Sequence, residues 1–161
     1  MRGVHTVTFV LSTALWFTCG AHCQTQASSE PSLLAGRTAI RQRHYAEAIH
    51  LLEHGLKRFP ADRTLKIELG RAYLYNRQDD RAMHLFREVL REEPSNRVAK
   101  LELARTLGYQ RDYEASNVLY RDLLDAGPDE AAEVGLIRNL MHQGKKAEAR
   151  RELDQDRKSV V

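Results

Sequence analysis

The sequence predicts an all-α solenoid in which antiparallel helix pairs stack side by side. Pro60, Pro94 and Pro128 follow one another at intervals of 34 residues, and the stretch 66–72 (KIELGRA) is echoed 34 residues later by 100–106 (KLELART). A fixed period of this length is the signature of a repeat architecture. Each unit also contains two amphipathic runs of helix length joined by a short polar turn, which is the pattern of an antiparallel helix pair.

The first pair is expected to comprise helices over 31–42 and 45–58. Ser29 followed by Pro31 indicates a helix start, because serine caps helix N-termini and proline fits the first turn. The second helix carries one apolar face, formed by Ala46, Ile49, Leu52 and Leu56. A single helix cannot bury such a stripe alone, so neighbouring pairs must stack to form a continuous core.

The later pairs repeat this pattern. Residues 65–94 hold two amphipathic runs on either side of the polar turn 76–80. In the third pair the apolar positions are Leu101, Leu103 and Leu107 in the first helix and Val118, Leu119 and Leu123 in the second. A fourth pair, over 131–142 and 145–157, fits the period if one residue is lost before Gly144. Its last helix has few apolar residues, as a terminal repeat with a polar outer face requires, so 131–157 is expected to cap the array.

The register of small and large residues resembles the tetratricopeptide repeat. Frames of 29–62, 63–96 and 97–130 place Gly36, Gly70 and Ala104 at the eighth position, and each proline ends its repeat. Ser116 departs from the pattern, because it stands where a smaller apolar residue is usual. The resemblance implies a right-handed superhelix over 31–158 that consists of three full repeats and a degenerate fourth, and it implies a binding module of bacterial, exported type.

The amino terminus has the three-part layout of a secretory signal. A short basic segment precedes the apolar run 7–17, which is too short to span a bilayer comfortably, and small polar residues follow. We therefore expect a signal peptide over 1–23, with cleavage between 21 and 27, and a polar linker over 24–30. The chain would then be exported to the periplasm or cell envelope. A retained membrane anchor and lipidation of a cysteine are the alternatives.

Nothing in the sequence indicates catalysis or a cofactor. There is no nucleotide-binding glycine loop, no zinc-protease motif and no serine elbow. His50 and His54 lie one turn apart on a helix, but no further ligand is fixed by spacing, so no metal site is predicted. The balance of 25 Lys and Arg against 22 Asp and Glu gives a net charge of +3, which describes a mixed surface and not a polycation. We predict a protein that is not an enzyme.

An arginine row is the most informative pattern for function. Arg37, Arg71 and Arg105 share the ninth repeat position, and Arg138 joins them if the lost residue lies before it. The resemblance implies that this position faces the concave wall. Arginine offers a planar donor fork for carboxylates, and tyrosine offers rigid contact area. The predicted groove residues are Arg37, Arg41, Glu68, Arg71, Tyr75, Glu102, Arg105, Tyr109 and Arg138.

The leading hypothesis is an adaptor that holds another protein or an extended peptide in this groove, by acidic residues or a free C-terminal carboxylate. A competing interpretation of the row is structural. Glu68 and Glu102 precede Arg71 and Arg105 by three residues, so each arginine could pair along its own helix. At the level of function, the alternatives are a structural or self-assembling subunit of an envelope complex and an electrostatic binder of polyanions such as nucleic acid.

Overall fold

A computed structural model describes residues 28–159 of the chain, with side chains described as far as residue 153. The predicted signal peptide over 1–23, and residues 24–27 of the predicted linker, lie outside this part. Within residues 28–159 the backbone forms eight α-helices and no strand. The helices are α1 (Glu30–Arg41), α2 (Tyr45–Arg58), α3 (Arg63–Tyr75), α4 (Asp79–Glu92), α5 (Arg97–Tyr109), α6 (Tyr113–Asp125), α7 (Glu130–His142) and α8 (Lys146–Ser159).

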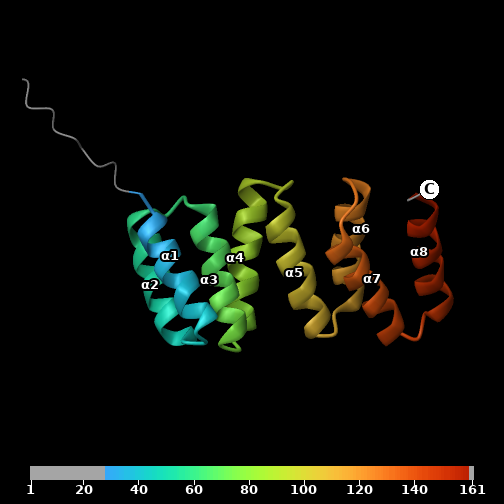
Figure 1. The fold of residues 1–161 in the computed structure, drawn as a ribbon, viewed down its shortest axis with the longest axis horizontal. Helices are drawn as coiled ribbons and strands as arrows, with labels where there is room; N and C mark the ends of the chain where they lie inside the picture. The colour runs from blue at the N-terminus through green and yellow to red at the C-terminus, as the bar shows by residue number, and fades with distance from the viewer. Residues whose placement is uncertain (1–27, 160–161) are drawn as a thin grey trace, which may run out of the picture.

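The helices follow one another along the long axis of the molecule as four antiparallel pairs (Figure 1). Each helix packs against the next in sequence, from α1 to α8. In addition, α1 packs against α3, α3 against α5 and α5 against α7, whereas the second helices of the pairs do not pack against one another within the described part. The first helices therefore line the inner, concave side of the array, and the second helices form its outer side.

Side-chain caps set the starts of four helices. Asp62, Asn96, Asp112 and Asp129 each accept a hydrogen bond from the backbone N–H three residues further on. Such caps satisfy donors that a helix leaves free at its N-terminus. Ser29 precedes α1, as predicted, but its hydroxyl does not cap the helix and instead hydrogen-bonds to the Asp62 carboxylate. That bond ties the first pair to the second.

The turns inside the pairs share one backbone conformation. Arg43, Arg77 and Arg111 have φ values of 64°, 62° and 67°, and Gly144 takes the same place in the fourth pair with a φ of 75°. Non-glycine residues rarely adopt this left-handed conformation, because the side chain crowds the backbone. The first three turns therefore hold a local strain that Gly144 avoids.

The small residues of the repeat mark close helix contacts. A Cβ atom on Gly36 would lie 2.5 Å from Leu52 Cγ, and one on Gly70 would lie 2.5 Å from Phe86 Cε1. Phe86 and Leu52 are both fully buried. Ala46 and Val118, predicted on the apolar stripes, are exposed instead, because the second helices of successive pairs leave their outer faces uncovered.

The last two pairs meet through a polar layer. Asn139 is buried and donates to Ser116 Oγ at 2.8 Å and to Asn117 Oδ1 at 2.9 Å. Ser116 in turn donates to the backbone oxygen of Ala104 at 2.6 Å. This network explains the serine that departs from the repeat pattern. It also lies between the two hydrophobic clusters of the core, one built from α1 to α5 and the other from α5 to α8.

The lost residue of the fourth repeat lies between Pro128 and α7. Pro94 is separated by one residue from the cap Asn96, whereas Pro128 is followed directly by the cap Asp129. Residues of α7 therefore correspond to residues of α5 that stand 33 positions earlier. Arg138 corresponds to Arg105 and thus takes the ninth position of its repeat.

Candidate functional site

The arginine row of the inner helices alternates with buried carboxylates. Arg37 in α1 approaches Glu68 Oε1 in α3 with Nε at 3.0 Å and Nη2 at 2.9 Å. In the same way Arg71 in α3 approaches Glu102 Oε1 in α5 with Nε at 2.9 Å and Nη2 at 2.8 Å. Each of these arginines therefore binds the next helix pair. We call this series of contacts the Arg–Glu ladder.

The predicted ion pairs between residues three positions apart on one helix are also present, but their distances are longer than those between helices. Arg71 Nη1 lies 3.1 Å from Glu68 Oε1, and Arg105 Nη1 lies 3.7 Å from Glu102 Oε1. Burial lowers the pKa of Arg71, but the attraction of Glu102 and its hydrogen bond outweigh this, so the pKa of Arg71 lies above its usual value. Glu68 and Glu102 are buried and would be costly to desolvate without these partners.

The ladder stops at the third pair. The residue of α7 that corresponds to Glu102 is Gly135, so Arg105 has no carboxylate in the next pair. A Cβ atom on Gly135 would lie 2.3 Å from Cζ of Tyr120, which fills the space where a side chain would begin. Arg138 is exposed and makes no hydrogen bond or ion pair with the described residues. Two guanidinium groups at this end of the row thus lack the inter-repeat acid that Arg37 and Arg71 have.

The aromatic row one turn later is interrupted at the same place. Tyr75 stacks on Tyr45 with ring centroids 5.4 Å apart, and His142 stacks on Tyr113 at 5.9 Å. Tyr109 lies between these two in the row, but the residue that corresponds to Tyr45 and Tyr113 in the second pair is Asp79. The Tyr109 ring is therefore unstacked among the described residues, and 73% of its surface is exposed.

A groove of about 670 Å³ runs along the inner face at this point. It is lined by six of the nine predicted groove residues: Arg71, Tyr75, Glu102, Arg105, Tyr109 and Arg138. Leu74, Arg77, Asp79 and Thr106, which the sequence did not single out, complete its wall. The three remaining predicted residues do not line it. Arg37 and Glu68 bind each other, and Arg41 contacts Thr38 at the exposed end of α1.

Tyr120, a buried residue of α6, is a further residue that sequence reasoning did not assign to the site. It lines two further hollows together with Arg105 and Arg138, one of about 420 Å³ and one of about 240 Å³. Burial raises the pKa of its hydroxyl, and the positive charges of Arg105 and Arg138 oppose this rise. The sequence signal that could have identified it is the hydroxyl of a large side chain at this repeat position. The first two pairs have the apolar residues Leu52 and Phe86 there.

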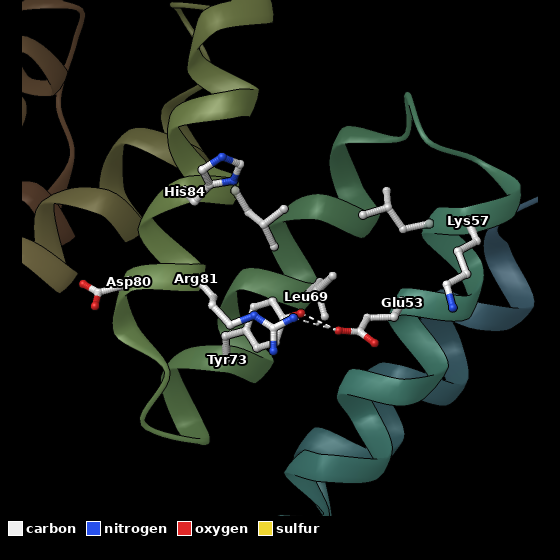
Figure 2. A pocket seen from close by; sticks show the side chains of 9 residues that line it. Glu53, Lys57, Leu69, Tyr73, Asp80, Arg81 and His84 are labelled. Carbon is white, nitrogen blue, oxygen red and sulfur yellow. Dashed lines mark hydrogen bonds and ion pairs between the residues drawn. The ribbon is translucent and has the colours of Figure 1, made fainter.

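A second groove, of about 720 Å³, lies on the outer side between α2 and α4 (Figure 2). Three of its polar side chains are paired with one another: the Tyr73 hydroxyl donates to Glu53 Oε1 at 2.5 Å, and Arg81 reaches the same oxygen at 3.3 Å. The Arg81 guanidinium also lies 4.2 Å from the centre of the Tyr73 ring. Figure 2 shows Glu53 and Arg81 facing each other across the groove from different helices. This cluster joins α2 to α4, which do not otherwise pack together.

Two further properties of the described residues bear on the site. No three His, Cys, Asp or Glu side chains gather there in an arrangement that could hold a metal ion. None of the described helices has the length and apolar character needed to cross a membrane.

Comparisons with known proteins identify the repeats. Two family models described as tetratricopeptide repeat match the chain, one over residues 39–102 and the other over residues 101–158. The chain is therefore a tetratricopeptide repeat protein over 39–158, as the register of its small residues predicted. No protein of curated function matches the sequence significantly.

Solved structures with the same architecture are numerous. A thermophilic tetratricopeptide repeat protein from Thermus thermophilus superposes with a TM-score of 0.70 at 16% identity, covering 80% of this chain and 72% of that one. The Sgt2 repeat domain from Aspergillus fumigatus gives 0.65 at 22% identity and covers 76% and 82%. The repeat domain of OM64 from Arabidopsis gives 0.66 at 19%, covering 71% and 95%. These likenesses establish the predicted all-α solenoid. Tetratricopeptide repeats in general bind other proteins.

Proposed function

We propose that this chain is a non-catalytic adaptor that holds an extended segment of a partner protein in its concave groove. The observation that carries the proposal is the gathering of Arg71, Tyr75, Arg105, Tyr109 and Arg138 around one groove of about 670 Å³. Tyrosine supplies rigid contact area at little conformational cost, and arginine supplies directional donors. The groove therefore combines the two side chains that are enriched where proteins bind one another.

Site-specific photo-cross-linking tests this proposal in cells that express the chain. A photoreactive phenylalanine analogue at Tyr109, on the inner face, should give a cross-linked product with a second protein. The same analogue at Val118, which is exposed on the outer helix α6, is the matched control and should give none. Products from Val118 but not Tyr109 would place the partner on the outer side. A product with twice the mass of the chain would instead support the self-assembling alternative.

We also propose that the chain works in the periplasm or cell envelope. Support comes from the signal-like layout of 1–23, in which a short apolar run precedes small polar residues. Fractionation of cells locates the protein, and its intact mass reports cleavage after Ala21 or Ala27. Recovery of the uncleaved chain from the cytosolic fraction would contradict export, whereas an uncleaved chain in the membrane fraction would indicate a retained anchor.

A further inference from the structure

The turns inside the helix pairs carry a second series of arginines. Arg43, Arg77 and Arg111 stand 34 residues apart, and each holds the left-handed position of its turn. Glycine adopts this conformation at little cost, as Gly144 does in the fourth pair. The first three pairs instead place the same large, charged side chain where the backbone is strained. Strain that recurs at one position points to a role for the side chain that glycine cannot perform.

These arginines are exposed and unbound along one edge of the array. None of the three side chains forms a hydrogen bond or an ion pair within residues 28–153. The turns inside the four pairs lie at one edge, and the connections between pairs lie at the opposite edge (Figure 1). The first edge therefore presents one unbound guanidinium for each of the first three pairs, and the exposed Lys146 continues the series in the fourth.

The two edges differ in charge. The connections inside the pairs hold six Lys and Arg but only two Asp, and they comprise residues 41–45, 75–79, 109–113 and 142–146. The connections between pairs hold three Arg and six Asp and Glu, and they comprise residues 58–63, 92–97 and 125–130. Two of those three arginines, Arg63 and Arg97, form ion pairs with acids of the same edge. The positive charge of the chain is thus concentrated on the edge formed by the connections inside the pairs, which we call the basic edge.

The layout of the basic edge suits a flat surface better than a small ligand. None of the grooves and hollows described above is lined by two of the three arginines, so they do not act together on one bound molecule. Tyr75 and Tyr109 stand two residues before Arg77 and Arg111, and they are 54% and 73% exposed. Tyrosine rings favour the boundary between water and a lipid bilayer, and a guanidinium group matches two oxygens of a phosphate.

We propose that the basic edge docks the protein on the surface of an anionic lipid bilayer, where Arg43, Arg77 and Arg111 bind lipid phosphate groups. The inference goes beyond the adaptor function, because it concerns where the protein is held and not what its groove binds. Each Lys or Arg close to an anionic bilayer strengthens binding by about fivefold, so a row of such charges gives attachment without a membrane-spanning helix.

Co-sedimentation of the full chain with vesicles tests this inference. One set of vesicles contains phosphatidylcholine with an equal amount of phosphatidylglycerol, and the other contains phosphatidylcholine alone. The apolar run 7–17 is present in every variant, and the neutral vesicles measure its contribution. We expect tighter binding to the anionic vesicles, and this preference should disappear at high salt because exposed charges are screened.

Replacing all three turn arginines by glycine separates their charge from their part in the fold. The variant Arg43→Gly, Arg77→Gly and Arg111→Gly should bind anionic vesicles about a hundredfold more weakly, at about fivefold for each lost charge. It should also remain folded, which circular dichroism checks, because glycine fits the left-handed turns.

The matched control removes three charges from the outer faces of α4 and α6. Arg87→Gln with Arg91→Gln and Arg121→Gln should change the affinity by less than about threefold, since charges beyond a Debye length from the surface are screened. The inference is overturned if this control loses as much affinity as the glycine variant, or if the glycine variant binds like the wild type.

Three further results would also overturn the docking on lipid. The first is equal binding of the wild-type chain to anionic and neutral vesicles. The second is binding to a thymidine oligonucleotide without binding to anionic vesicles, which would assign the basic edge to nucleic acid. The third is a pellet that forms without vesicles and is lost in the glycine variant, which would place the basic edge against the acidic edge of a second copy.

Discussion

Replacing Glu102 by glutamine tests the Arg–Glu ladder directly. The change keeps the shape of the side chain but removes the charge that two guanidinium nitrogens of Arg71 approach at 2.9 and 2.8 Å. Removing one partner of a buried ion pair costs about 3–5 kcal/mol. Arg71 keeps Glu68 at 3.1 Å, and the new amide oxygen still accepts a hydrogen bond, so we expect a smaller loss of about 2 kcal/mol.

Chemical and thermal unfolding measure this loss. A change of about 2 kcal/mol should lower the melting temperature by about 4–8 °C for a chain of this size. Glu88→Gln is the control, because Glu88 meets Arg91 only at 3.8 Å on the outer surface and should change stability by at most about 0.5 kcal/mol. A double-mutant cycle with Arg71→Gln should give a coupling energy of about 1–2 kcal/mol.

Two results would refute the ladder as a source of stability. One is a loss for Glu102→Gln no larger than that for Glu88→Gln. The other is strict additivity in the cycle, which would mean that Arg71 and Glu102 do not act on each other. Either result would mean that Arg71 is not held by Glu102 and is available to bind a ligand.

Three further predictions follow from the packing and the turns. Gly70→Ala should cost about 1–3 kcal/mol in urea unfolding, because the new Cβ would lie 2.5 Å from Phe86; an unchanged midpoint would show that the helices can separate. Arg77→Gly should raise the melting temperature by relieving the left-handed turn, a gain of about 0.5–1 kcal/mol, and a lower temperature would contradict the strain. Burial and the Glu53 hydrogen bond raise the pKa of Tyr73 from 10.0 to about 12, so its contribution to stability is complete below pH 10 and is lost as the pH rises towards 12. Alkaline unfolding should show this loss, on the order of 2 kcal/mol, and Tyr73→Phe should abolish it; an equal loss in the variant would assign it elsewhere.

The repeat period accounts for how well the helices could be predicted. The helix Tyr45–Arg58 has the predicted bounds, and the lost residue of the fourth repeat was placed before Gly144, as Pro128 and Asp129 now show. Local signals suffice for these features, because caps, prolines and apolar spacing act within a few residues. The predicted apolar faces of the helices were less accurate. Ala46 and Val118 fit the spacing yet are exposed, since spacing alone does not say which face a neighbouring pair covers.

The candidate site also has features that the sequence predicts and features that depend on the tertiary structure. The sequence by itself predicted that Arg37, Arg71 and Arg105 share one face, because a fixed period repeats one orientation, and it placed Arg138 with them only if the lost residue precedes it. Only the tertiary structure decided which of them are already bound. Arg37 and Arg71 meet carboxylates that stand 31 residues further along the chain, whereas the corresponding residue for Arg105 is Gly135, which lies against the Tyr120 ring. Such pairings depend on the distance and volume between stacked helices, and these are set by packing across pairs and not by the pattern within one.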